Sequence, residues 1–91
     1  METIWKYKLN IQDDQSIRVP KGAELLEVLM QGEVLCVWFK VDPKNDLIER
    51  HFTVAGTGNP IHCNWGRLHH VGSVIQDIFV WHVFERKNIE L

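Results

Sequence analysis

The segment with the clearest capacity for chemistry is Gly56-Thr57-Gly58-Asn59-Pro60. Glycine adopts positive φ without strain, so two glycines one residue apart can turn successive amide N–H groups toward a common point. Such a concave set of amides binds phosphate or another oxyanion, and the side chains of Thr57 and Asn59 would add hydrogen bonds. The alternative is a plain tight turn before Pro60, a common role for glycine pairs. The segment is not a P-loop, because Gly-Lys-Ser/Thr is missing and no helix is predicted to follow.

Arg50 is the candidate cation for an anionic ligand. The alternation predicts that it shares a strand face with three apolar residues, Ile48, Phe52 and Val54. A guanidinium in such a place must find a carboxylate, a phosphate or water. One interpretation is a phosphate clamp that works with the Gly56–Asn59 loop. The alternatives are a register that exposes Arg50 to water, or a salt bridge to one of the acidic residues Glu49, Glu27 and Glu85.

Two further candidates lie in the polar segment that follows the loop, which also contains Cys63. His62 would add a donor and charge for an anion. Trp65 lies beside a glycine, and a tryptophan in a loop can stack on a base or anchor a protein interface. The alternative for Trp65 is a lid that folds back over the sheet. The predicted ligand-binding set is therefore Arg50, Gly56, Thr57, Gly58, Asn59, His62 and Trp65.

The five histidines do not predict a metal site. Adjacent residues on a strand point to opposite faces, so His69 and His70 are poorly placed to hold one ion together. Cys-x-x-Cys and His-x-x-x-His spacings are both missing from the sequence. His82 lies on an apolar strand face, as a hydrogen-bonded core histidine or as a donor to phosphate. With no Gly-x-Ser-x-Gly motif either, we expect a protein without metal, cofactor or enzymatic activity.

The composition limits the class of protein and of partner. Ninety-one residues predict one domain, 1–91, with a core sufficient for folding and with a benefit from homo-oligomerisation. A net charge of −2 argues against extended nucleic acid and against an anionic membrane surface. The two cysteines, Cys36 and Cys63, are too few for a disulfide framework, so we expect free thiols in a reducing compartment. No leader segment or transmembrane helix is predicted.

Period-two alternation and turn residues place these candidates on strands. Aromatic and β-branched residues alternate with polar ones between clusters of Gly, Pro, Asp and Asn. The residues Glu24–Met30 have helical propensity, but their place before Gly32 favours a strand, with a single short helix as the alternative. The predicted strands are Thr3–Ile11, Ser16–Val19, Glu24–Met30, Val34–Val41, Leu47–Ala55, Leu68–Ile75 and Ile78–Arg86. The fold class is mainly β, with six to seven antiparallel strands in a sandwich, barrel or curled meander. Trp5, Trp38 and Trp81 are expected in its core.

An ordered set of motifs spans nearly the whole chain. These are Ile-Trp-Lys-Tyr-x-Leu at 4–9, Val-Pro-Lys-Gly-Ala-Glu-x-Leu at 19–26, Val-Asp-Pro at 41–43, Val-Ala-Gly-Thr-Gly-Asn-Pro-Ile at 54–61, Val-Gly-Ser-Val at 71–74 and Val-Trp-His-Val-Phe-Glu at 80–85. The sequence thereby resembles a family of small proteins encoded mainly by tailed bacteriophages and prophages. The resemblance implies a phage origin and a β-rich domain, and it transfers no catalytic residues.

Three functional hypotheses follow. The first is a non-enzymatic phage accessory protein that binds and sequesters a small anionic, nucleotide-like ligand in the host cytoplasm to counter host immune signalling, acting as a homo-oligomer. The second is a protein-binding module that inhibits a host enzyme or serves as a virion accessory component, which requires an exposed apolar or edge-strand surface. The third is a hydrolase of a phosphorylated signal that uses His62, His69 and His70.

Overall fold

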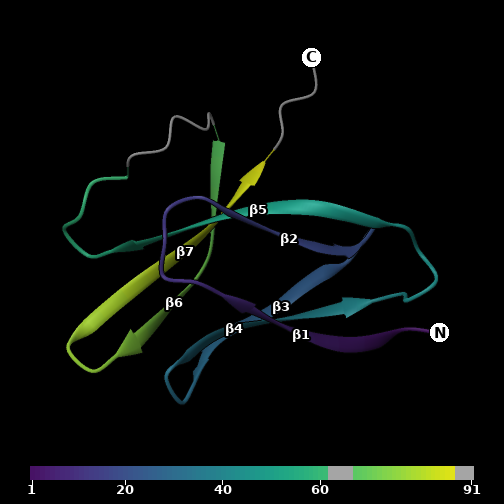
Figure 1. Ribbon diagram of the computed structural model, residues 1–91, viewed down its shortest axis with the longest axis horizontal. Coiled ribbons are helices and arrows are strands. Elements are labelled where there is room, and N and C mark those ends of the chain that lie inside the picture. Colours follow the sequence, from purple (N-terminus) through teal and green to yellow (C-terminus); the bar gives the residue numbers. More distant parts are fainter. Residues whose placement is uncertain (62–66, 88–91) are drawn as a thin grey trace.

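The alternation of apolar and polar residues produces seven strands, and no helix, in the part of the chain that the structure describes. The computed structural model describes residues 1–61 and 67–87 (Figure 1). Its strands are β1 (Thr3–Leu9), β2 (Gln15–Pro20), β3 (Glu24–Gln31), β4 (Val34–Val41), β5 (Leu47–Gly56), β6 (Arg67–Gln76) and β7 (Phe79–Lys87). The prediction of a mainly β, antiparallel fold is confirmed. The described residues include no helix that could span a membrane.

The strands form two sheets that lie face to face. One sheet has the order β1-β4-β3 and the other the order β2-β5-β7-β6, with every pair antiparallel. The molecule measures 40 × 37 × 15 Å, and its short dimension is that of two stacked sheets. Of the three arrangements that the sequence left open, the structure is a sandwich.

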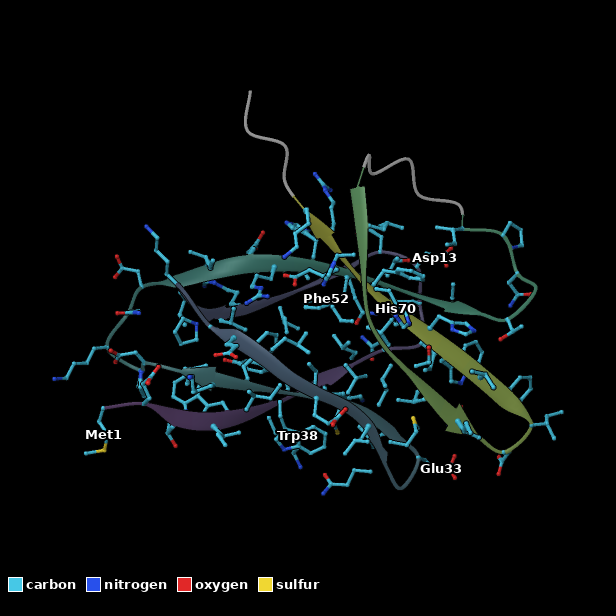
Figure 2. All side chains as sticks on the ribbon, turned by 180° about the vertical axis from the view of Figure 1, so that it is seen from behind. Met1, Asp13, Glu33, Trp38, Phe52 and His70 are labelled. Atoms are coloured by element: carbon cyan, nitrogen blue, oxygen red, sulfur yellow. The ribbon has the colours of Figure 1, made fainter. Side chains whose placement is uncertain are left out.

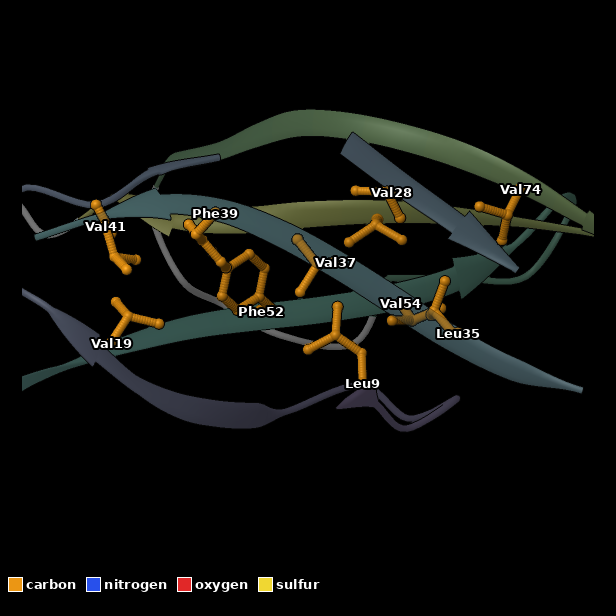
Figure 3. Packing of buried hydrophobic residues seen from close by; sticks show 12 residues of the cluster. Leu9, Val19, Val28, Leu35, Val37, Phe39, Val41, Phe52, Val54 and Val74 are labelled. Carbon is orange, nitrogen blue, oxygen red and sulfur yellow. The ribbon is translucent and has the colours of Figure 1, made fainter. Parts of the chain in front are cut away.

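One hydrophobic cluster fills the space between the sheets (Figure 3). Phe39 of β4 and Phe52 of β5 meet across this space with ring centroids 6.4 Å apart and an interplanar angle of 72°. Both rings are fully buried. The other fully or nearly buried members are Leu9, Val19, Val28, Leu35, Val37, Val41, Val54, Val74 and Val83. An edge-to-face aromatic pair between layers fixes how the sheets sit on each other.

The segment Glu24–Gln31 is a strand, as predicted, and the helical alternative is wrong. It forms a hairpin with β4 through a turn in which Gly32 has a φ of +60°. A β-bulge between Leu25 and Glu27 interrupts its register. Val28 is buried on the core side of this strand. Pairing with β4 and burial of one face therefore override the helical propensity of the sequence.

The tryptophans are less buried than the sequence predicted. Trp81 packs against the core cluster and is half-buried. Trp38 is also half-buried, and its register partners, Lys6 and Glu27, place it on the outer face of its sheet. Trp5 pairs with Phe39 on the core side but is 37% exposed, because β1 is an edge strand. The prediction of a core position is wrong for Trp5 and Trp38.

The β6–β7 hairpin reaches out at one corner of the molecule (Figure 1). Gln76 pairs with Phe79, so Asp77 and Ile78 form a two-residue turn, in which Asp77 has a φ of +53°. A bulge between His70 and Gly72 interrupts β6. This hairpin carries most of the polar and aromatic side chains of the candidate site.

Candidate functional site

The Gly56–Asn59 segment is a hydrogen-bonded turn at the end of β5. Gly58 has a φ of +85°, and the Asn59 amide donates to the Gly56 carbonyl at 3.0 Å. The Thr57 amide donates to the Val80 carbonyl on β7 at 3.2 Å. Two of the amides around the predicted nest are therefore used inside the protein. The Gly58 amide makes no hydrogen bond to the described residues, so it is available to a ligand.

An aromatic pair lies beside this turn on the core side of its sheet. Phe79 and Trp81 stack with ring centroids 5.5 Å apart and an interplanar angle of 20°. The Trp81 indole N–H donates to Gln76 Oε1 at 3.0 Å, which fixes the orientation of the indole. The Phe79 ring is the outer member of the stack and is 52% exposed. A planar hydrophobic surface is thus presented to solvent.

The turn and the aromatic pair line one hollow of about 400 Å³. Gly56 is closely packed here, because a Cβ at this position would lie 2.8 Å from Asn59 Nδ2 and 3.0 Å from the Trp81 ring and would displace the Asn59 side chain. The side-chain amide of Asn59 and the Trp81 indole therefore pack directly against the Gly56 backbone. The lining is Gly56, Thr57, Asn59, Ile78, Phe79, Val80 and Trp81. The hollow combines a flat apolar wall with a polar corner.

A chain of hydrogen bonds runs over the outer face of the same sheet. His82 Nε2 lies 2.6 Å from Thr57 Oγ1, and His82 Nδ1 lies 2.9 Å from Ser73 Oγ. Ser73 Oγ is also 3.0 Å from His70 Nε2, and the His70 ring packs edge-to-face on Phe84 with centroids 5.3 Å apart. His70 lies on β6, near the point where this strand crosses β7 in the view of Figure 2. Thr57 is thereby held in place from the side opposite the aromatic hollow.

The hydrogen-bonded chain is better suited to positioning than to nucleophilic catalysis. In a Ser–His–carboxylate triad the buried carboxylate stabilises the imidazolium that forms when serine loses its proton. Here a hydroxyl, that of Thr57, occupies the third place. An imidazole with both nitrogens engaged is held in a fixed orientation, and it fixes the hydroxyls of Ser73 and Thr57 in turn.

Arg50 forms a buried ion pair with Glu85, one of the alternatives that the sequence left open. Its Nε and Nη2 donate to the two Glu85 carboxylate oxygens at 2.5 and 2.8 Å, and its Nη1 donates to the Ala23 carbonyl at 2.5 Å. The guanidinium lies 4.9 Å from the centre of the Phe39 ring. Its side chain is 17% exposed and that of Glu85 is 6% exposed. All three guanidinium nitrogens are therefore engaged within the protein.

The structure does not bring Arg50 to the Gly56–Asn59 turn. Six residues of extended chain separate Arg50 from Gly56, which corresponds to about 20 Å at the usual rise per residue. Arg50 lines two hollows toward the other end of β5, together with Ala23 and Glu85. Neither hollow includes a residue of the turn. The described members of the predicted ligand set are thus divided between two separate places on the sheet.

The remaining predicted residues are placed as follows. His62 and Trp65, like Cys63, lie outside the described residues. His69 pairs with Glu85 and His70 with Phe84, residues on opposite faces of β7. Cys36 is a free, buried thiol. The described residues contain no group of three or more His, Cys, Asp or Glu side chains that could hold a metal ion.

Four residues of the site were not predicted as site residues: Ser73, Gln76, Phe79 and Trp81. A signal for part of this set was present in the sequence. A two-residue turn at Asp77-Ile78 fixes the hairpin register, and counting outward from it pairs Val74 with Trp81 and Ser73 with His82. His70 could not be found in this way, because the bulge after it shifts the register.

The comparisons with known proteins agree with the extent of the fold. No curated protein and no solved structure matches the chain. The match to a family spans residues 1–90, which includes all seven strands and both faces of the candidate site. The chain therefore belongs to the family described as a domain of unknown function, DUF7352.

Proposed function

We propose that this protein is a binding domain that holds a small, planar, nucleotide-like ligand beside the Gly56–Asn59 turn. The observation that carries the proposal is the exposed Phe79 ring, stacked on Trp81 and facing a polar turn across a single hollow. An aromatic ring system of the ligand would lie against Phe79. Its polar or anionic group would meet the side chains of Thr57 and Asn59.

The properties of the hollow favour binding over catalysis. Its polar side chains are the Thr57 hydroxyl and the Asn59 amide, which donate hydrogen bonds to an oxyanion without adding charge. Phe79 and Trp81 supply a stacking surface, which tolerates different bases because every base has a π-face. Arg50 has no part in the proposed site, because its guanidinium is committed to Glu85 and Ala23. The wider role, sequestration of a nucleotide-like signal in a phage-infected host, rests on the sequence resemblance.

The test is thermal melting of the protein against linear and cyclic nucleotides, with the nucleotide recovered and analysed afterwards. A ligand of the native state adds about 2.7 kcal/mol of stability at a hundredfold excess over its Kd. We expect a raised Tm with at least one nucleotide, which is recovered intact. A silent panel would refute the ligand and direct the search to protein partners, and a consumed nucleotide would favour a hydrolase.

The variant Phe79→Ala tests the location of the site. Base–aromatic stacking contributes about 1–3 kcal/mol, so removal of the ring should raise Kd by about 5-fold to 150-fold in calorimetric titration. The matched control is Ile4→Ala, an apolar truncation at a residue that is 59% exposed on the other sheet. We expect its Kd to equal that of the parent protein. Equal losses in the two variants would show that the ligand does not bind beside Phe79.

A further inference from the structure

We propose that β6 is a self-association edge, through which two copies of the chain pair antiparallel about a two-fold axis. The two four-stranded sheets would then form one continuous sheet. The regular part of the edge, Gly72–Gln76, lies beyond the bulge and would form the centre of the contact. This inference is independent of the ligand proposal.

The four edge strands of the two sheets differ in how they are protected. An exposed edge invites pairing with another chain, and proteins block this with charged residues, proline or bulges. The edge β1 carries Lys6 and Lys8, and β2 carries Arg18 and Pro20. The edge β3 carries Glu24 and Glu27 at its bulge. Each of these three edges therefore has at least one protective feature in its central part.

The edge β6 lacks such charges over most of its length. It has ten residues, more than any other edge strand, and from Leu68 to Gln76 it contains no Lys, Arg, Asp, Glu or Pro. Ile75 on this strand is 71% exposed, and Ile78 in the adjoining turn is 89% exposed. The His70/Gly72 bulge protects one half of the edge and leaves Gly72–Gln76 in regular pairing with β7.

Charge identifies a second copy as the partner that fits this edge. In a two-fold antiparallel pair each strand meets its own sequence, so a charged residue near the axis faces a like charge from its partner. Self-pairing of β1 would oppose lysines, that of β2 arginines, and that of β3 glutamates. Self-pairing of Gly72–Gln76 opposes only uncharged residues and places the Ile75 side chains at the contact.

The experiment measures the mass of the purified chain by light scattering over a series of concentrations. We expect a species of twice 10.7 kDa that dissociates on dilution. The variant Ile75→Lys introduces like charges at the contact and should raise the dimer Kd at least tenfold. The matched control is Leu29→Lys, at a residue that is 50% exposed on the edge strand β3, and it should leave the dimer Kd unchanged. Both variants should unfold in a single cooperative transition, because the substituted side chains are exposed.

Amide hydrogen exchange gives a second measurement that locates the contact. Exchange over Gly72–Gln76 should slow as the concentration rises, whereas exchange in β1 should not change. Three outcomes would overturn the proposal. These are a monomer at every concentration up to the solubility limit, an Ile75→Lys dimer as stable as the parent, or a dimer that Leu29→Lys disrupts to the same extent.

Discussion

Arg50 and Glu85 form a buried ion pair, in which each charge depends on the other for compensation. Both side chains are largely buried, and the guanidinium makes a two-pronged contact with the carboxylate. The Ala23 carbonyl takes a further guanidinium hydrogen, and Lys87 Nζ lies 3.9 Å from the carboxylate. A buried ion pair gains little over apolar residues of the same shape, but loss of one partner leaves a charge without compensation.

Substitution of Arg50 should therefore be costly. Arg50→Met should lower the free energy of unfolding by about 3–5 kcal/mol, measured by urea denaturation. Lys40→Met is the control, because the Lys40–Glu24 pair has 44% and 62% exposed side chains and such pairs contribute about 0–1 kcal/mol. The double variant Arg50→Met/Glu85→Leu should recover part of the loss. Equal effects at Arg50 and Lys40 would contradict the assignment of a buried pair.

Tyr7 offers a direct measure of burial at one residue. It packs edge-to-face on Phe39 with ring centroids 5.6 Å apart, and burial raises the pKa of its phenol above the ordinary value of about 10. It is the only tyrosine in the chain, so the phenolate absorbance reports its titration alone. We expect a midpoint above that of free tyrosine in the native protein and a normal midpoint in denaturant.

The same shift predicts a loss of stability in alkali. A phenol with a raised pKa binds more protons in the folded state, so its contribution to stability is present below about pH 10 and is lost above it. The pKa of Lys40 is also raised, by its hydrogen bond to Glu24, and acts in the same direction. Tyr7→Phe should flatten the alkaline fall in Tm relative to the parent. An unchanged alkaline fall in Tyr7→Phe would show that Tyr7 is not its source.

At the scale of elements, the contact between β3 and β6 holds the two sheets together at one side. Gly72 follows the bulge in β6 and faces Val28 of β3, which is buried. A Cβ at position 72 would lie 3.2 Å from the Val28 Cβ, closer than ordinary van der Waals contact. The Val28 Cβ is fixed by its backbone, so relief requires a small separation of the sheets.

Gly72→Ala should consequently destabilise the fold by about 1–3 kcal/mol, the usual cost of overpacking. The φ of Gly72 is not positive, so the effect is steric rather than conformational. Because Val28 Cβ and Cγ2 are the atoms in contact, the double variant Gly72→Ala/Val28→Gly, which removes both, should lose less stability than the sum of the single variants, in a denaturant-based double-mutant cycle. Additive losses would show that the two side chains do not compete for the same space.

The hairpin β6–β7 shows how far element-level prediction reaches into the site. The sequence predicted a turn at Gln76-Asp77, whereas the structure has it one residue later, at Asp77-Ile78, and the pairing of Ser73 with His82 follows from this later turn. The bulge at His70 was not predicted, because Leu68–Ile75 has no strict apolar alternation whose change of phase would reveal one extra residue. The hydrogen bond of His70 to Ser73 depends on that bulge.

For the whole molecule, the chain passes between the sheets instead of completing one before the other. Strands β1, β3 and β4 build one layer, while β2 and β5 to β7 build the second. Two open sheets have four edge strands, and the proposed dimer would remove the β6 edge from each copy. The candidate ligand hollow is lined by Phe79 and Trp81, which lie on the core side of their sheet. Ile75, at the proposed dimer contact, pairs in register with Val80 and therefore lies on the opposite face.

The sequence by itself determined the seven strands, the approximate places of their turns and, with the exception of Trp5 and Trp38, much of the alternation between core and solvent. These features depend on neighbours along the chain: a period of two fixes the faces, and glycine, proline and aspartate fix the turns. The strand at Glu24–Gln31 was also predictable from the sequence, since Gly32 and the apolar β4 segment indicated a hairpin.

Only the tertiary structure decided which residues act together. Arg50 forms its ion pair with Glu85, 35 positions later in the sequence. Its guanidinium is therefore not available for the predicted phosphate clamp. The Thr57 amide donates a hydrogen bond to the Val80 carbonyl, and the Thr57 hydroxyl is hydrogen-bonded to His82. Such choices depend on strand order and on sheet packing between distant segments. Several acidic residues could have formed the ion pair with Arg50. The sequence around Arg50 does not indicate which of them lies beside it in the fold.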